Sequence, residues 1–260
     1  MPTIIYPTPI FGPVKSRRLG ISLGINLQPG DGKICTFDCI YCECGFNADN
    51  IPQQPRPTRK EVKEKLEQVL WKMRSEEQQL DDITFAGNGE PTAHPDFEGI
   101  VADTVDLRDE YYPEAKLSVL SNSTFIHKPS VRNALLMVDN NILKLDTVSP
   151  EYINRADRPT SKRYDVKEII EGMKAFNGHA IIQTMFMKGR DMEGRDIDNT
   201  GPEYVDPWLK AVEYIKPGSV MVYTIDRKTP DHNLQKASHE ELDAIRDKVV
   251  AMGIPCTASY

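Results

Sequence analysis

Three cysteines of this sequence stand close enough together to hold one soft-metal centre. Cys35, Cys39 and Cys42 follow one another in the order C-x3-C-x2-C, and Cys44 comes two residues later. Thiolates with this spacing can wrap either an iron–sulfur cluster or a zinc ion. Structural zinc requires four protein ligands, usually in two separated pairs, and no second C-x2-C or histidine pair follows here. A cluster held by three thiolates keeps one iron open, and chemistry at a metal needs such an open position.

A glycine-rich turn supplies a second set of polar groups. Residues 83–86 form an apolar run, and Gly87-Asn88-Gly89-Glu90 follows it directly. The two glycines allow the backbone to approach a ligand closely and to present its N–H and C=O groups, while Glu90 adds a carboxylate. A lone Gly-x-Gly is also common as a plain strand-to-helix turn with a solvated glutamate. A ligand-binding role for this turn is favoured because the same chain carries the cysteine motif.

In this order, the two motifs resemble those of the radical S-adenosylmethionine (SAM) superfamily. The resemblance rests on the cysteine spacing, on the aromatic Tyr41 just before the last cysteine, and on the Gly-Asn-Gly-Glu-Pro turn. It implies that Cys35, Cys39 and Cys42 ligate a [4Fe–4S] cluster and that residues 87–90 hold SAM on its open iron. It also implies an enzyme in which an electron, from a donor such as flavodoxin or ferredoxin, cleaves SAM to methionine and a 5′-deoxyadenosyl radical. The competing hypothesis is a binding or regulatory module whose cysteine loop carries structural zinc or a sensing cluster.

The lead-in at residues 12–26, which is dense in glycine and basic residues, and the segment 226–230 extend the resemblance to a smaller group. They resemble short iron–sulfur oxidoreductases related to the wyosine synthases, which make a tricyclic tRNA base. One difference is that wyosine-type members carry further N-terminal cysteines for a second cluster, whereas no cysteine precedes Cys35 here. Guanidinium groups can clamp an anion in bidentate fashion, although a solvated basic turn explains residues 17 and 18 equally well. The predicted substrate contacts are Arg17, Arg18 and Arg227.

Short apolar runs alternate with helical patterns along the chain, which is the order expected of βαβ units. The predicted strands cover residues 21–27, 83–86, 116–120, 142–145, 180–186 and 220–225. Helix starts are predicted from N-cap signals at Thr58 with Glu61, at Ser238 with Glu241, and at Asp206 before Pro207. The other predicted helices cover residues 97–108, 129–138 and 161–176.

Six strands of this kind predict an α/β fold with a parallel sheet, in the form of a partial (β/α)6 TIM-like barrel. This is also the fold that the radical SAM resemblance implies. A closed eight-stranded barrel needs more strands than the sequence shows, and a doubly wound open sheet is the alternative. We expect one domain, with a lead-in at 1–20, a barrel core at about 21–235 and a C-terminal helix and strand at about 238–260.

Polar side chains follow the predicted strands at their carboxyl ends, where both folds bind ligands. By position they resemble the residues with which the superfamily binds its cofactor. The predicted cofactor contacts are Tyr41, Gly87, Asn88, Gly89, Glu90, Ser121, Asn122, Lys144, Asp146, Gln183 and Tyr223. Ser121 and Asn122 could instead cap the helix that follows them. Lys144 and Asp146 share a strand face and could form a buried structural ion pair.

The remaining cysteines and the composition bear on the cellular compartment and on the class of substrate. Cys44 is predicted to be a bystander, because a fourth thiolate would close the position that SAM needs, and Cys256 to be a small buried hydrophobe. Clustered cysteines in odd number argue against a secreted disulfide framework, and the N-terminus lacks a signal-peptide pattern, so we expect a cytoplasmic protein without a membrane anchor. A net charge of −7 disfavours a nucleic-acid substrate without excluding one. The substrate stays open between a nucleoside or RNA, a peptide and a small metabolite.

Overall fold

The computed structural model describes residues 4–16 and 18–260, which contain one large and one small β-sheet. The large sheet has eight strands in the order β1-β2-β3-β4-β5-β6-β8-β10, antiparallel between β1 and β2 and parallel between all other neighbours. Its strands are β1 Ile10–Ser16, β2 Gly20–Ile25, β3 Asp82–Phe85, β4 Lys116–Ser121, β5 Asn140–Lys144, β6 Ala180–Met185, β8 Ser219–Tyr223 and β10 Cys256–Ser259. The small antiparallel sheet pairs β7 Met187–Gly189 with β9 Leu234–Lys236.

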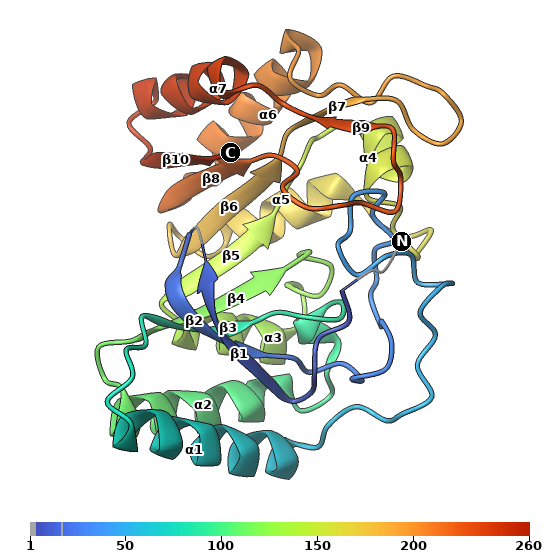
Figure 1. The fold of residues 1–260 in the computed structure, drawn as a ribbon. Coiled ribbons are helices and arrows are strands. Elements are labelled where there is room, and N and C mark those ends of the chain that lie inside the picture. The colour runs from blue at the N-terminus through green and yellow to red at the C-terminus, as the bar shows by residue number, and fades with distance from the viewer. Residues whose placement is uncertain (1–3, 17) are drawn as a thin grey trace.

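The large sheet curls into an open half-barrel, and helices follow most of its strands (Figure 1). The helices are α1 Arg59–Ser75, the short 3-10 helix η1 Pro91–Ala93, α2 Phe97–Tyr111, α3 Pro129–Met137, α4 Pro150–Ala156, α5 Val166–Lys174, α6 Pro202–Ile215 and α7 His239–Ala251. All six predicted strands are present, as β2 to β6 and β8. The predicted partial (β/α)6 TIM-like barrel is therefore confirmed, in preference to the doubly wound alternative. Among the described residues, no helix combines the length and apolar character that a membrane crossing requires.

The two faces of the parallel strands carry different side chains, because consecutive residues of a strand point to opposite sides. On one face, Ile83 and Phe85 of β3 belong to the main hydrophobic core, together with residues of the helices such as Leu66 and Trp208. Burial of this face against the helices supplies most of the apolar contact that holds the half-barrel together. The alternate positions of the same strands point to the concave side, where they are free to be polar.

A buried polar network crosses this concave side near the start of the strands. The Asp82 carboxylate accepts hydrogen bonds from the hydroxyls of Ser118 and Thr84. Thr84 also contacts the Ser22 hydroxyl at 2.7 Å, and Asn140 donates to Ser118 at 3.0 Å. Burial raises the pKa of Asp82 to about 6. The network ties β2, β3, β4 and β5 together through side chains as well as backbone.

Two predicted helix starts are confirmed and a third is wrong. Capping boxes open α1 at Thr58 and α7 at Ser238, with both reciprocal hydrogen bonds present. Helix α6, however, starts at Pro202 rather than after Asp206, and Pro207 lies inside it. The earlier proline already occupies the first helical position, and Pro207 removes one intrahelical hydrogen bond without ending the helix. The helix predicted at 161–176 is also shorter than expected, because Asp165 caps α5 at Val166.

Candidate functional site

The cysteine loop lies at the carboxyl edge of the sheet, between the glycine turn and the end of α4. β2 leads into the loop, and Ile34, just before the first cysteine, pairs with the glycine turn. The Ile34 N–H donates to the Asn88 carbonyl at 3.1 Å, and the Ile34 carbonyl accepts from the Glu90 N–H at 3.2 Å. On the other side of the loop, the Ile40 N–H donates to the Ala156 carbonyl at 2.9 Å. Backbone hydrogen bonds therefore set the two sequence motifs side by side.

The thiols of Cys35, Cys39 and Cys42 lie close enough on this loop to affect one another's ionisation. All five cysteines are free thiols. Burial raises the pKa of Cys35 to about 12 and raises that of Cys39 well above its ordinary value. A hydrogen bond with Cys44 lowers the pKa of Cys42 to about 6. In the part of the chain that the structure describes, no three His, Cys, Asp or Glu side chains are placed to hold a single metal ion.

Hydrogen-bond donors and one ammonium surround these sulfur atoms. The Phe37 N–H and the Asn122 amide point at Cys35 Sγ from 3.5 and 3.6 Å. Lys33 is 3% exposed, donates from Nζ to the Gly45 carbonyl at 2.7 Å, and faces the three thiols. Donors of this kind stabilise sulfur ligands that carry negative charge. Three thiols with N–H donors and a cation around them fit an anionic iron–sulfur group.

The glycine turn depends on residues without a side chain. Gly89 has a φ of +127°, and a Cβ at this position would lie 2.0 Å from the Ile34 carbonyl oxygen. The Asn88 side chain is used inside the protein, since Oδ1 accepts from the Tyr6 N–H at 2.8 Å and Nδ2 donates to the Tyr6 and Pro29 carbonyls. The N–H groups of residues 88–90 also donate within the protein, to Asn26, Gly87 and Ile34. What the turn can present to a ligand is therefore its backbone carbonyl oxygens.

The Glu90 carboxylate, predicted to contact the cofactor, is buried and binds protein groups. Oε1 accepts from the Thr92 hydroxyl and from Ser121 Oγ at 2.9 Å, and Oε2 accepts from the Asn122 N–H at 2.7 Å. Burial raises the pKa of this carboxyl, and the hydrogen bonds oppose the rise. Glu90 thus links the glycine turn to the end of β4.

Ser121 and Asn122 are held at the cysteine loop by these contacts. The Asn122 amide also donates to Thr36 Oγ1 at 2.8 Å. The alternative that they cap the following helix is wrong, because α3 begins at Pro129 with Lys128 in the N-cap position. Both residues instead connect the strand end to the loop that carries the thiols.

A buried charged network joins the cysteine loop to β5 and to the end of α4. Lys144 Nζ lies 2.6 Å from Asp146 Oδ2 and 3.4 Å from Asp157 Oδ1. The Tyr41 hydroxyl donates to the Asp146 carboxylate and lies 3.0 Å from Asp157 Oδ1, and the Lys144 ammonium lies 4.3 Å from the centre of the Tyr41 ring. Burial alone would lower the pKa of Lys144, but the two carboxylates raise it well above its ordinary value. Burial raises the pKa of Asp157 to about 8.

Asp157 is a member of this network that the sequence analysis missed. The buried ion pair between Lys144 and Asp146, which the sequence offers as the alternative to cofactor contacts, is present. Asp157 is the residue that follows α4, and its Oδ1 lies 4.0 Å from Cys39 Sγ. Ser149 before Pro150 is an N-cap signal for α4, and reading it as a helix start could have placed Asp157 at the other end of that short helix.

Two buried donors near this network have no hydrogen-bond partner among the residues that the structure describes. They are Arg18 Nη1 and Gln183 Nε2. The Arg18 guanidinium lies 4.9 Å from the centre of the Tyr223 ring. Gln183 pairs in register with Lys144 on one side and with Met221 on the other, so its side chain stands on the same face as that of Lys144.

The other predicted site residues have separate positions. Arg227 is exposed and lies 2.6 Å from Glu43 Oε2 and 3.0 Å from the Tyr6 hydroxyl. Arg17 lies outside the described residues. The Cys44 thiol donates to the Gly87 carbonyl at 3.4 Å, and Cys256 on β10 packs partly buried against the main core.

A family model matches the part of the chain that carries this site. The model of the radical SAM superfamily matches residues 31–200, which is more than half of the chain and includes the cysteine loop, the glycine turn and the charged network. The chain belongs to the radical SAM superfamily. The cofactors of this family are a [4Fe–4S] cluster and SAM.

Curated relatives of this radical SAM protein cover most of its length. It is 27% identical to the "GTPase Obg" of Brachyspira hyodysenteriae over 241 residues, which are 90% of this chain and 32% of that protein. It is 28% identical to a UPF0026 protein of Helicobacter pylori over 240 residues, 91% of this chain and 72% of that protein. The chain therefore spans 32% of one relative and 72% of the other.

Solved structures share the half-barrel. Streptococcus suis SuiB bound to S-adenosylmethionine matches with a TM-score of 0.63 at 14% identity, over 91% of this chain and 50% of SuiB. TYW1 with a bound lysine–pyruvate adduct matches with a TM-score of 0.61 at 13% identity, over 88% of this chain and 73% of TYW1. At these identities the likeness shows the radical SAM fold alone.

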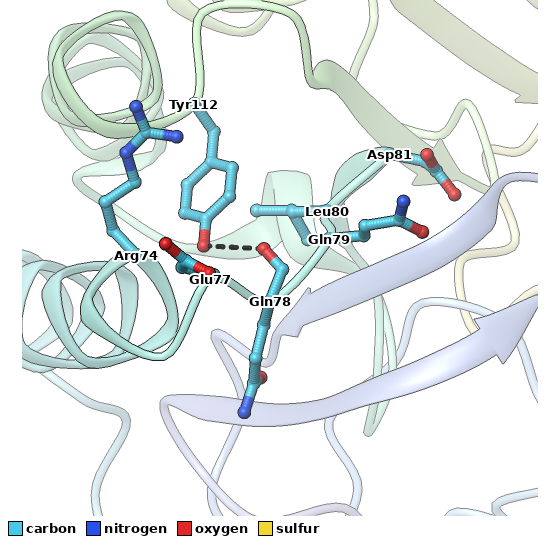
Figure 2. Close-up of a pocket in the computed structure, with 7 residues that line it drawn as sticks. All are labelled: Arg74, Glu77, Gln78, Gln79, Leu80, Asp81 and Tyr112. Atoms are coloured by element: carbon cyan, nitrogen blue, oxygen red, sulfur yellow. Dashed lines mark hydrogen bonds between the residues drawn. The ribbon is translucent and has the colours of Figure 1, made fainter.

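The surface grooves of this radical SAM protein need to be told apart from its cysteine site. Figure 2 shows a groove of about 680 Å³ in which the Tyr112 hydroxyl donates to the Gln78 carbonyl at 3.0 Å. It is lined by Arg74, Glu77, Gln78, Gln79, Leu80, Asp81 and Tyr112. Most of these residues connect α1 to β3, at the amino ends of the strands and so at the edge opposite the cysteines. A hollow of about 370 Å³ does border the cysteine loop, and Phe46 and Arg158 are part of its lining.

Proposed function

We propose that this protein uses a [4Fe–4S] cluster held by Cys35, Cys39 and Cys42 to cleave SAM reductively and to modify a substrate within the half-barrel. The observation that carries the proposal is the backbone pairing of Ile34 with the glycine turn, which sets the three thiols beside a backbone able to receive SAM. When bound, the cluster supplies the electron that breaks the sulfonium bond to give the 5′-deoxyadenosyl radical. The protein supplies position and protection from water.

The glycine turn would hold the amino end of SAM through its backbone. Gly87 and Gly89 permit the positive φ values of the turn and the close approach of Asn26 and Ile34 to it. Glu90 keeps the turn fixed to Ser121 and Asn122. The Asn88 side chain secures the N-terminal segment through Tyr6. These residues thus act as a rigid frame for the cofactor.

The network of Tyr41, Lys144, Asp146 and Asp157 would clamp the cysteine loop to the barrel. Its members donate and accept within the group, and Asp146 Oδ1 also accepts the Met185 N–H at 2.9 Å. A fully paired network of this kind is rigid and keeps charged groups out of contact with water. We assign Tyr41, Lys144 and Asp146 to the orientation of the cofactor end of the barrel.

The substrate side of the site carries two buried hydrogen-bond donors that lack an acceptor among the described residues. Arg18 Nη1 and Gln183 Nε2 are buried without partners among the described residues, and burying a polar group unpaired costs free energy of about 1–3 kcal/mol. A carboxylate or phosphate of a ligand accepts hydrogen bonds from donors of this kind. The substrate we propose is therefore an anion-bearing nucleoside, peptide or metabolite. Tyr223, beneath the Arg18 guanidinium, offers an apolar face beside that anion.

In cells, the electron would come from a one-electron donor such as flavodoxin or ferredoxin. Free, clustered thiols suit a reducing compartment, so we place the protein in the cytoplasm. Glu43, which follows Cys42 in the sequence, forms an exposed ion pair with Arg227.

The experiment that tests this function measures 5′-deoxyadenosine. Protein reconstituted anaerobically with iron and sulfide is supplied with SAM and dithionite, and product is quantified against time. We expect release by the wild type and by Cys256→Ser, whose cysteine lies on β10 away from the loop, and none by Cys39→Ala. Release by Cys39→Ala at the wild-type rate contradicts the proposal. Zinc near one equivalent per chain, without iron or sulfide, would favour the binding or regulatory module instead.

A further inference from the structure

Lys33 places a buried ammonium beside the cysteine thiols. Its side chain is 1% exposed, and Nζ donates at 2.7 Å to the carbonyl of Gly45, the residue that follows Cys44. Its charge acts on the thiols of Cys35, Cys39 and Cys42. The carboxylate paired with it, Asp38 Oδ1, is 3.9 Å away. Lys33 therefore holds a buried ammonium inside the cysteine loop, with its carboxylate partner Asp38 at a distance.

The surroundings of Lys33 differ from those of the other lysine at the site. Lys144 has carboxylate oxygens at 2.6 and 3.4 Å, one from Asp146 and one from Asp157. A buried ammonium with a single distant carboxylate destabilises a fold unless another negative charge lies close to it. Three neutral thiols do not supply that charge, whereas three thiolates on a metal centre do. The position of Lys33 is thus suited to an anionic group on the cysteines.

A charge in this position acts differently on two oxidation states. A [4Fe–4S] group on three thiolates is anionic, and one added electron makes it more so. Coulomb attraction to a fixed cation grows with the negative charge, and it is strong where water is excluded. Cluster potentials respond to net charge, to burial and to hydrogen bonds at the sulfurs. A buried cation therefore favours the reduced state over the oxidised one.

We propose that Lys33 is a positioning residue that raises the reduction potential of the cluster, and so sets how readily the donor can reduce it. This inference rests on the proposed function and adds a residue that controls its electron-transfer step. In that step one electron passes from a low-potential one-electron donor to the cluster. The donor is oxidised and the cluster reduced, no bond forms or breaks, and no proton moves.

The test is a redox titration of three variants, followed by the EPR signal of the reduced cluster. Lys33→Gln removes the charge but keeps an N–H donor for the Gly45 carbonyl, and Lys33→Arg keeps the charge. We expect Lys33→Gln to lower the midpoint potential by about 59 mV, a tenfold change in a one-electron equilibrium. Lys33→Arg should stay near the wild type. Lys60→Gln on α1, which removes an exposed lysine, is the matched control and should leave the potential unchanged.

A variant of opposite sign keeps the test independent of how well Lys33→Gln folds. Asp38 accepts the Asn47 N–H at 2.7 Å, and an asparagine can keep that bond through its carbonyl oxygen. Asp38→Asn removes the negative charge that partly compensates Lys33. The midpoint potential should therefore move to less negative values. A merely structural role for either residue would not move the two potentials in opposite directions.

The outcomes separate this inference from the function on which it rests. Equal potentials in Lys33→Gln and wild type, or shifts of the same sign in Lys33→Gln and Asp38→Asn, overturn the role of Lys33 alone. If Lys33→Gln retains no iron, its midpoint potential cannot be measured and Asp38→Asn decides. A midpoint potential of Asp38→Asn that is not less negative than that of the wild type then overturns the role of Lys33. A wild-type protein without any [4Fe–4S] signal overturns the proposed function together with this inference.

Discussion

The guanidinium of Arg18 lies 4.9 Å from the centre of the Tyr223 ring. Arg18 stands in the turn between β1 and β2, on one side of the curled sheet, whereas Tyr223 ends β8 near the other side. A cation over an aromatic face is attracted by the negative charge of that face. The contact thus reaches across the half-barrel, and it leaves Arg18 Nη1 buried without a partner among the described residues.

Arg18→Ala should separate substrate modification from SAM cleavage. Loss of a charge-assisted hydrogen bond costs about 1.5–3 kcal/mol, which corresponds to roughly ten- to hundredfold weaker substrate binding. SAM cleavage without substrate should persist, because Arg18 does not contact the cysteine loop. The measurement pairs 5′-deoxyadenosine release by the purified variant with an untargeted comparison of metabolites in cells. Lys15→Ala, an exposed neighbour on β1, is the control, and a product that accumulates normally with Arg18→Ala would contradict the assignment.

Gly89→Ala should destabilise the fold far more than Gly194→Ala does. Both glycines have positive φ, but a Cβ at Gly89 meets the Ile34 carbonyl oxygen at 2.0 Å, whereas nothing lies within 4 Å of one at Gly194. We expect a loss of about 1 kcal/mol from backbone strain at Gly194 and more than about 3 kcal/mol at Gly89. Urea unfolding of the apoprotein measures both. Equal losses would mean that the pairing of the turn with Ile34 is not tight.

Lys144→Met should strongly weaken the clamp on the cysteine loop. It leaves the Asp146 carboxylate buried without its cation beside the carboxyl group of Asp157, a change that costs about 3–5 kcal/mol. The double variant Lys144→Met with Asp146→Asn should recover part of this loss, because the unpaired charge of Asp146 is then gone. Thermal unfolding of the four proteins of the cycle gives the coupling energy. Additive losses would indicate that the network is not coupled.

Asp82 should make the stability of the fold depend on pH. Burial raises the pKa of this carboxyl from 3.8 to about 6, so its contribution is fully present below pH 3.8 and is lost as the pH rises through 6. Between pH 5 and 7.5 the wild type should lose about 1–2 kcal/mol relative to Asp82→Asn, whose amide does not titrate. Urea unfolding of the two apoproteins across this range gives the difference. A difference that stays constant with pH would show that Asp82 keeps an ordinary pKa.

The parallel strands could be predicted because each is a short apolar run bounded by turns. Strand β1 was not predicted, because Pro13 interrupts it and much of its surface is exposed. Only an edge strand tolerates these two features, and β1 lies at the edge of the sheet. The predicted start of α6 at Asp206 is too late, because Asp206 before Pro207 carries the same helix-start signal as Gly201 before Pro202. Local signals of equal strength cannot rank two candidate starts.

The candidate site could be predicted where one segment carries the chemistry. The cysteine loop and the glycine turn are local motifs, and their spacing is visible in the sequence. Asp82 and Asp157 are different, because each matters through partners that come from other parts of the chain. Asp157 reaches Tyr41 across 116 positions, and no periodicity or cap reports such a contact.

The central claim is that three thiolates hold an iron–sulfur cluster whose remaining iron binds SAM. EPR of the anaerobically reduced protein with and without SAM tests it most directly. The account predicts a [4Fe–4S] signal that requires Cys35, Cys39 and Cys42, survives Cys44→Ala, and changes its g-values when SAM is added. A reduced signal that SAM leaves unaltered, or a cysteine loop that holds zinc and no iron, would contradict it.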